Sequence, residues 1–319
     1  MASFHSRQRP VFCGRLTDSA RLLLAFSLLA FFLASCGQRQ NQPAQSARSV
    51  IPSFSHIFII VLENKEYTTI IGNKQARYLN SLTNAYAVAD NYYAIAHPSL
   101  PNYLALTGGS TFGLSQDCTG CFQAAPNLAD QIEASGRSWK AYMESMPAPC
   151  YIGNSPDGLY TQKHDPFVYY DDIRTNKSRC TSHIVPLTQL FTDIAANHLP
   201  DYTWISPNMC NDMHSCSIAV GDKWLSQIVP TILHSDAFTH DGVLFITFDE
   251  GKSGASCCGD AQGGKIVSFV ISPLVRAGWR SNTPETHYSL LRTVEASWGL
   301  SPLGNAARSA PMGEYFLKR

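Results

Sequence analysis

Short apolar runs alternate with longer amphipathic segments along most of this chain. A continuous apolar run predicts a buried strand at residues 57–62. Runs rich in β-branched and aromatic residues predict further strands at 139–143, 202–206, 243–248 and 266–271. A helical period of apolar positions predicts helices at 76–83, 127–135, 187–196, 223–233 and 288–298, with Asn127 as an N-cap and Gly136 and Gly299 as stops.

Strands that alternate with helices along a chain favour a parallel sheet. We therefore predict an α/β fold with a mostly parallel central sheet and helices on both faces. Ligands of such sheets bind at the carboxyl ends of the strands. We find no internal repeat, and we predict one domain over residues 51–319 with a loop-rich insertion at about residues 112–180.

The amino-terminal segment has the pattern of an export signal. Four arginines precede an uncharged apolar run at residues 22–34, which is short for a membrane span but typical of a signal peptide. The run ends in Leu33-Ala34-Ser35-Cys36, which resembles a bacterial lipobox. We expect a lipoprotein signal at 1–35, lipidation of Cys36 and a flexible tether at 36–50; a plain secretory signal is the alternative. The protein would then be exported and anchored to the cell envelope by lipid.

Composition excludes several classes of protein. Hydrophobic residues make up 45% and charged residues 15% of the chain, which excludes a disordered protein and a coiled coil. The 24 basic and 24 acidic side chains cancel, so a nucleic-acid partner is not expected.

The cysteines fit an oxidising compartment. Eight remain after the signal and the lipidation site, and an even number in an exported protein predicts disulfides. The local pairs Cys118–Cys121 and Cys210–Cys216 come first, while the partners of Cys150, Cys180, Cys257 and Cys258 stay open. Adjacent cysteines are awkward partners for each other. A zinc site made from Cys118, Cys121, Cys257 and Cys258 is the alternative.

Acidic and amide side chains follow two of the predicted strands. Glu63-Asn64 comes directly after the first strand, and Asp249-Glu250 directly after the strand at 243–248. Neighbouring carboxylates at a buried strand end repel each other unless a cation compensates them. A hard divalent metal with oxygen ligands would do so, and solvated turn residues are the alternative.

A serine stands at the start of another predicted helix. In His97-Pro98-Ser99-Leu100-Pro101-Asn102, we expect Ser99 at the N-cap, Pro101 in the first turn, and a stop at Gly108. Free N–H groups at a helix N-terminus bind anions, so a phosphate would lie beside the Ser99 hydroxyl. An ordinary helix cap is the alternative.

Two further stretches place histidine among polar neighbours, Lys163-His164 and Asn211-Asp212-Met213-His214. His214 follows the strand at 202–206, which puts it at the same sheet edge as Glu63 if the sheet is parallel. A histidine there can protonate a leaving group or donate to a phosphoryl oxygen. A single such histidine is more often an ordinary loop residue.

These five motifs, in their order along the chain from Glu63-Asn64 to Asp249-Glu250, resemble the bacterial phosphoesterase family. That family contains acid phosphatases and phospholipases C and is related to the alkaline phosphatase superfamily. The resemblance runs from about Phe54 to Leu300 and implies an alkaline-phosphatase-like fold. It implies one divalent metal ion held by Glu63, Asn64, Ser99, Asp249 and Glu250. It also implies Ser99 as nucleophile, with His97, His164 and His214 around the phosphate, and we add Asn102, Lys163 and Asp212 as substrate contacts.

The expected reaction is hydrolysis of a phosphate monoester through a phosphoserine, with a small-molecule or lipid phosphate ester as substrate and phosphatidylinositol 3-phosphate as one lipid candidate. His214 or His164 would act as general acid. A phospholipase C-type phosphodiesterase and a silent surface protein that binds phosphate or metal are the alternatives. His287 lies in a similar stretch, and we expect it to pack or cap a helix start.

Overall fold

A twisted sheet of nine strands organises residues 51–317, the part of the chain that the computed structural model describes. The strand order is β4-β3-β5-β1-β6-β7-β2-β8, and β9 also pairs with β2. The strands are β1 (Ile57–Leu62), β2 (Ala87–Tyr93), β3 (Trp139–Met143), β4 (Ile184–Pro186), β5 (Tyr202–Ser206), β6 (Val243–Phe248), β7 (Lys265–Ile271), β8 (Arg280–Ser281) and β9 (Glu285–Thr286).

The central strand β1 lies between β5 and β6 and is parallel to both. Its six residues are buried because helices cover both faces of the sheet, which explains the continuous apolar run. In the β1–β6 register Leu62 is opposite Phe248, so both strands end at the same level. The residues after these two strands therefore meet at one edge of the sheet.

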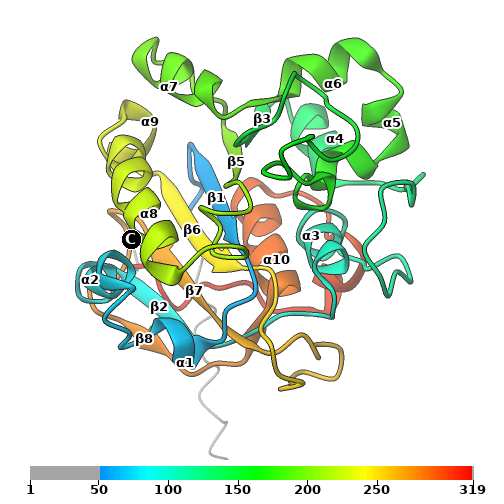
Figure 1. Ribbon diagram of the computed structural model, residues 1–319. Coiled ribbons are helices and arrows are strands. Elements are labelled where there is room, and N and C mark those ends of the chain that lie inside the picture. The colour runs from blue at the N-terminus through cyan, green and yellow to red at the C-terminus, as the bar shows by residue number, and fades with distance from the viewer. Residues whose placement is uncertain (1–50, 318–319) are drawn as a thin grey trace, which may run out of the picture. The chain divides into compact units, whose positions relative to one another are not determined.

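Helices lie on both sides of this sheet (Figure 1). Helices α2 and α8 pack together on one side, and α3 and α10 pack together on the other. The described helices are α1 (Tyr67–Ile70), α2 (Arg77–Ala85), α3 (Ser99–Gly108), α4 (Leu128–Ala134), α5 (Asp171–Arg174), α6 (Lys177–His183), α7 (Thr188–Ala195), α8 (Ile218–Leu233), α9 (Asp236–Thr239) and α10 (His287–Trp298), with 3-10 turns at Gln162–His164, Pro166–Tyr169 and Gly304–Arg308.

The predicted α/β fold with a mostly parallel sheet is confirmed. All five predicted strands are present, although β7 begins one residue earlier and is antiparallel to both β6 and β2. Strand β2 was missed, because Asp90 and Asn91 interrupt its apolar pattern where the ladder to β7 shifts register. Helix α8 begins at Ile218, five residues before the prediction, since its first turn is mostly exposed.

Four disulfides link the cysteines that remain after the expected signal. The predicted pairs Cys118–Cys121 and Cys210–Cys216 are confirmed, and Cys150 pairs with Cys180. Cys257 pairs with its neighbour Cys258, although adjacent cysteines are awkward partners. The alternative of a zinc site is wrong, because all four of its sulfurs are used in disulfides.

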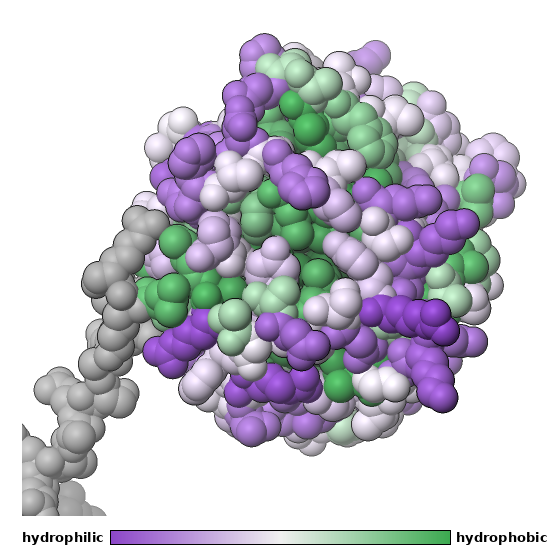
Figure 2. Space-filling view, turned by 90° about the vertical axis from the view of Figure 1, so that its left-hand side faces the viewer, coloured by the Kyte–Doolittle hydropathy of each residue, from purple (hydrophilic) through white to green (hydrophobic). Residues whose placement is uncertain are grey.

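The described surface mixes polar and apolar residues. On the face that Figure 2 shows, green and purple residues alternate instead of forming one apolar area. Between residues 51 and 317, no helix has the length and apolar character needed to cross a membrane. The expected signal at 1–35, the tether at 36–50 and the lipidation of Cys36 lie outside the described residues and stay predictions.

Candidate active site

The two acidic strand ends meet as the register requires. Glu63 and Asp249 are fully buried, and the backbone N–H of Asn64 donates to Asp249 Oδ1 at 2.8 Å. The Asn64 side-chain amide donates to Glu63 Oε2 at 2.8 Å. Asn64 has a φ of 54°, a conformation that asparagine tolerates better than most residues. The turn at Asn64 therefore links the carboxylates of Glu63 and Asp249, which follow two neighbouring strands.

Helix α3 places Ser99 against this carboxylate cluster. Ser99 is the first helical residue and follows the N-cap Pro98, so the predicted N-cap position is wrong by one residue. Gly108 is the last helical residue, and the left-handed C-cap is Gly109, one residue after the predicted stop. Ser99 Oγ donates to Glu63 Oε2 at 3.1 Å and lies 3.5 Å from Glu250 Oε1. The serine hydroxyl thus lies at the amino end of a buried helix.

Lys163 and His164 lie in the segment between β3 and β4. Lys163 Nζ donates to Ser99 Oγ at 3.2 Å. His164 is buried, with Nε2 at 3.0 Å from Glu63 Oε1 and Nδ1 at 3.4 Å from Asp212 Oδ2. Burial disfavours both charges, but their mutual attraction prevails: it raises the pKa of His164 to about 9 and, with Lys163, lowers the pKa of Glu63 to about 2.

Sequence reasoning missed Tyr103 as a member of this cluster. Its ring stacks on the His164 imidazole with centroids 5.2 Å apart, and its hydroxyl donates to Glu63 Oε1. Tyr103 lies one helical turn after Ser99, and residues four apart share a helix face. That spacing was a usable signal for the missed residue.

The negative charge of the site is least compensated at the carboxylates of Asp249 and Glu250. Burial and the charges of Glu63 and Glu250 raise the pKa of Asp249 well above its ordinary range. Its Oδ2 is buried and has no hydrogen-bond partner among the described residues. An orphaned carboxylate oxygen beside other oxygen donors is what a hard divalent cation satisfies. The donor chemistry of the expected metal set therefore fits such an ion.

A metal site can also be judged by whether three or more ligating side chains already lie together in the structure. Within residues 51–317, no group of three or more His, Cys, Asp or Glu side chains is arranged to hold a metal ion. The expected set relies on an amide and a hydroxyl, Asn64 and Ser99, besides its carboxylates. Metal binding and its ligands therefore stay predictions.

The loop before α3 holds His97 and Asn102. His97 pairs through Nδ1 with Glu250, and its Nε2 lies 3.0 Å from the Ser253 carbonyl oxygen. Asn102 Oδ1 accepts from the backbone N–H groups of Ile95 and Ala96, and its Nδ2 donates to the carbonyl oxygens of Ala96 and Pro98. Asn102 thus positions the loop with all of its usual hydrogen bonds. Its expected substrate contact stays a prediction.

His214 and Asp212 lie in the loop after β5. Asp212 is buried, accepts from the His214 backbone N–H at 2.7 Å and faces His164. The His214 side chain is exposed, in contrast to that of His164. Partial burial lowers the pKa of His214, although the charge of Glu63 opposes this shift. His214 and His97 are thus the exposed imidazoles among the predicted site residues, whereas His164 is enclosed.

His287 begins α10, as expected of a helix-start residue. It is buried, and its Nε2 lies 2.6 Å from the Asp249 carbonyl oxygen. Burial lowers the pKa of His287 to about 4, so the ring is neutral at pH 7 and Nε2–H donates to that carbonyl. His287 thus supports the backbone of Asp249.

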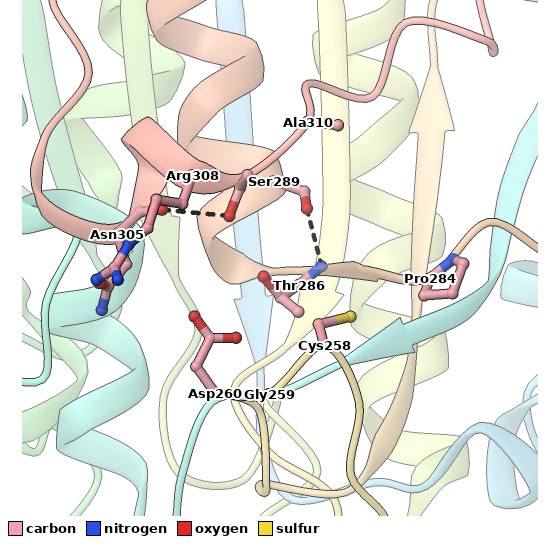
Figure 3. A pocket seen from close by; sticks show the side chains of 10 residues that line it. Cys258, Gly259, Asp260, Pro284, Thr286, Ser289, Asn305, Arg308 and Ala310 are labelled. Atoms are coloured by element: carbon pink, nitrogen blue, oxygen red, sulfur yellow. Dashed lines mark hydrogen bonds between the residues drawn. The ribbon is translucent and has the colours of Figure 1, made fainter.

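A cavity of about 570 Å³ lies outside this constellation, lined by residues of the loop after Cys258, the start of α10 and the segment near Arg308 (Figure 3). Thr286 and Ser289 form a capping box there, in which each side chain accepts a hydrogen bond from the backbone N–H of the other residue. None of the predicted site residues lines this cavity.

Comparison with known proteins identifies the family and agrees with the fold. A family model described as "Phosphoesterase family" matches residues 72–301, which is most of the chain. This chain belongs to the Phosphoesterase family.

Solved structures of the alkaline phosphatase superfamily have the same fold. A Vibrio parahaemolyticus member superposes with a TM-score of 0.54 at 11% identity, covering 79% of this chain and 69% of that one. The lipoteichoic acid synthase of Listeria monocytogenes superposes with 0.57 at 9% identity, covering 83% and 77%.

Sequence relatives are named as phosphatases. The phosphatidylinositol-3-phosphatase of Mycobacterium tuberculosis is 33% identical over 91% of this chain and 90% of its own length. An acid phosphatase of Aspergillus fumigatus is 31% identical over 87% of this chain, but the match spans only 62% of that enzyme. The chain thus spans about three fifths of this fungal relative and nearly all of the mycobacterial one.

Proposed function

We propose that this member of the Phosphoesterase family is an exported, metal-dependent phosphatase that hydrolyses phosphate monoesters through a phosphoserine at Ser99. One observation carries the proposal: Ser99 Oγ lies at a helix amino end between an acceptor, Glu63 Oε2 at 3.1 Å, and a cation, Lys163 Nζ at 3.2 Å. A serine held between an acceptor and a positive charge at a helix amino end is suited to attack a phosphoryl group.

Glu63, Asn64, Ser99, Asp249 and Glu250 would hold the divalent metal ion. When bound, it supplies Lewis-acid stabilisation of phosphoryl charge and of the serine oxygen. The chain's own residues contribute the rest. Glu63 orients the Ser99 hydroxyl, while Tyr103 and His164 hold the Glu63 carboxylate in place.

The first chemical step forms a bond between Ser99 Oγ and phosphorus and breaks the bond from phosphorus to the ester oxygen. Lys163 stabilises the negative charge on the phosphoryl oxygens. The leaving alkoxide takes a proton from His214, since the His164 imidazole is enclosed by Glu63 and Asp212. As Ser99 Oγ bonds to phosphorus, its proton passes to Glu63 Oε2, the acceptor at 3.1 Å. Water then attacks phosphorus and gives one proton back to His214, while Ser99 Oγ leaves and regains its proton from Glu63.

The substrate class and the location are part of the proposal. The substrate is a small-molecule or lipid phosphate ester, and the name of the mycobacterial relative makes phosphatidylinositol 3-phosphate the lipid to test. The four disulfides support a location outside the reducing cytoplasm. The lipobox-like sequence ending in Cys36 adds a lipid anchor on the envelope.

Phosphate release from p-nitrophenyl phosphate and from phosphatidylinositol 3-phosphate tests the proposal. Ser99→Ala should lose about a thousandfold or more in kcat and still fold, and EDTA should abolish the wild-type activity. Ser268→Ala is the matched control, because Ser268 is also a buried serine but lies within β7 without a partner among the described residues. Full activity of Ser99→Ala would exclude the phosphoserine, and release only from p-nitrophenylphosphorylcholine would indicate a diesterase.

A further inference from the structure

The carboxylate of Asp117 occupies donors that a phosphoryl group would need. Asp117 Oδ1 accepts from the backbone N–H of Leu100 at 3.0 Å, and its Oδ2 accepts from Lys163 Nζ at 2.9 Å. Leu100 is the second residue of α3, so its N–H has no acceptor within the helix and is available to an anionic group at the helix amino end. Lys163 Nζ also contacts Ser99 Oγ. Both donors therefore lie next to the proposed nucleophile.

We propose, on the basis of the proposed function, that Asp117 competes with the phosphoryl group for Leu100 N–H and Lys163, and that its side chain turns away when phosphate binds. A carboxylate and a phosphoryl group are both anionic acceptors, so they cannot share these donors without strong repulsion. The apparent affinity for phosphate is then reduced by the fraction of molecules in which Asp117 occupies the site.

The surroundings let the side chain move while the loop stays in place. The loop after Asp117 is held by a hydrogen bond from the Tyr169 hydroxyl to the Cys118 carbonyl oxygen and by one from Gln162 Nε2 to the Thr119 carbonyl oxygen. The Cys118–Cys121 disulfide closes the same loop. The Asp117 side chain is 32% exposed, so rotation takes its carboxylate into solvent.

A different role would use the same contacts. Asp117 would be a positioning residue if it kept Lys163 aimed at Ser99 throughout turnover. The two roles predict opposite signs when the charge is removed: loss of a competitor strengthens phosphate binding, and loss of a support for Lys163 weakens it. The sign of the change in phosphate affinity therefore decides between them.

The experiment compares wild type with Asp117→Asn, using p-nitrophenyl phosphate as substrate and inorganic phosphate as competitive inhibitor. Competition predicts that KM and the inhibition constant for phosphate both fall about fivefold while kcat does not rise, because product phosphate also leaves more slowly. A Ki that is unchanged or raised overturns the proposal. Asp117→Ser gives the same comparison should Asp117→Asn lower the melting temperature.

Asp201→Asn is the matched control. Asp201 also accepts from one backbone N–H, that of Ser138 at 2.7 Å, and pairs with one cation, Arg137 at 3.4 Å. Its side chain is 30% exposed, like that of Asp117, but it precedes β5 and so lies at the opposite edge of the sheet from Ser99. Asp201→Asn should leave both constants unchanged.

Two measurements separate this inference from the proposed function. Calorimetric binding of inorganic phosphate does not require turnover, so tighter binding by Asp117→Asn supports competition even if wild type hydrolyses nothing. Normal hydrolysis with unchanged phosphate binding refutes competition alone. A crystal structure with bound phosphate should place Asp117 Oδ2 beyond about 4 Å from Lys163 Nζ, and a carboxylate that keeps both contacts overturns the inference.

Discussion

At the scale of single residues, the site is built around one buried carboxylate. Glu63 has no exposed surface, and four side chains contact it: Asn64 next to it in the chain, Ser99 and Tyr103 on α3, and His164. The sequence predicted Glu63, Ser99 and His164 from motifs. It did not predict Tyr103 or Asp117, whose contacts depend on how α3 and the insertion come together. The histidines also differ in environment, which no motif reveals.

His214 leads to a prediction about pH. A general acid must be protonated, and the pKa of His214 lies below the ordinary value of 6.5. We therefore expect kcat to fall as pH rises through this lowered pKa, so that activity is highest on the acid side. His214→Gln should remove this fall and lower kcat at acid pH by about a hundredfold. The pH profile of kcat measures both effects.

His240→Gln is the control for that profile. Its imidazole is exposed and lies 3.4 Å from the Thr239 hydroxyl, much as His214 lies 3.2 Å from the Ser215 hydroxyl. The control should keep the wild-type profile. An unchanged profile in His214→Gln would assign the leaving-group proton to water or to another residue.

At the scale of elements, α3 is the helix that the site depends on. All ten of its residues are buried, and its left-handed C-cap Gly109 touches the segment that follows α10. Gly109 has a φ of 68°, and a Cβ there would lie 2.2 Å from the Leu303 carbonyl oxygen. The sequence predicted a glycine stop at Gly108, and a glycine does end this helix, but one residue later; helix boundaries vary by a residue or two.

Gly109→Ala should destabilise the protein by about 3 kcal/mol or more, because left-handed strain adds to a collision with backbone. Gly299→Ala should cost only about 1 kcal/mol. Gly299 is also a left-handed C-cap, with a φ of 66°, but a Cβ there would meet nothing within 4 Å. Urea unfolding of both variants measures the difference, and equal costs would show that the Leu303 segment moves aside freely.

At the scale of the whole described part of the chain, a residue near position 315 contacts a strand of the sheet. Tyr315 donates a hydrogen bond to Glu285 in β9, and both side chains are buried. Burial raises the pKa of Glu285 to about 8, although the hydrogen bond from Tyr315 opposes this shift. This carboxyl group is therefore protonated in the folded protein at neutral pH.

Stability should consequently depend on pH through Glu285. The folded state binds this proton more tightly than the unfolded state, whose pKa is near 4.5, so the free energy of unfolding falls as pH rises from about 4.5 to about 8. The upper bound of this loss is about 5 kcal/mol. Glu285→Gln should flatten this part of the curve, measured by denaturant unfolding at several pH values. An identical slope in the variant would mean that Glu285 is ionised when folded.

Local sequence determined five of the nine strands, most of the described helices, two disulfides and the family. Apolar periodicity and motif spacing are properties of neighbouring residues, so one chain suffices to detect them. Tertiary structure decided the rest: the antiparallel place of β7, the pairing of β2, the enclosure of His164, and the contacts of Asp117 with Leu100 and Lys163. These depend on which distant segments pack together and on how much water they exclude. Local patterns do not encode that information.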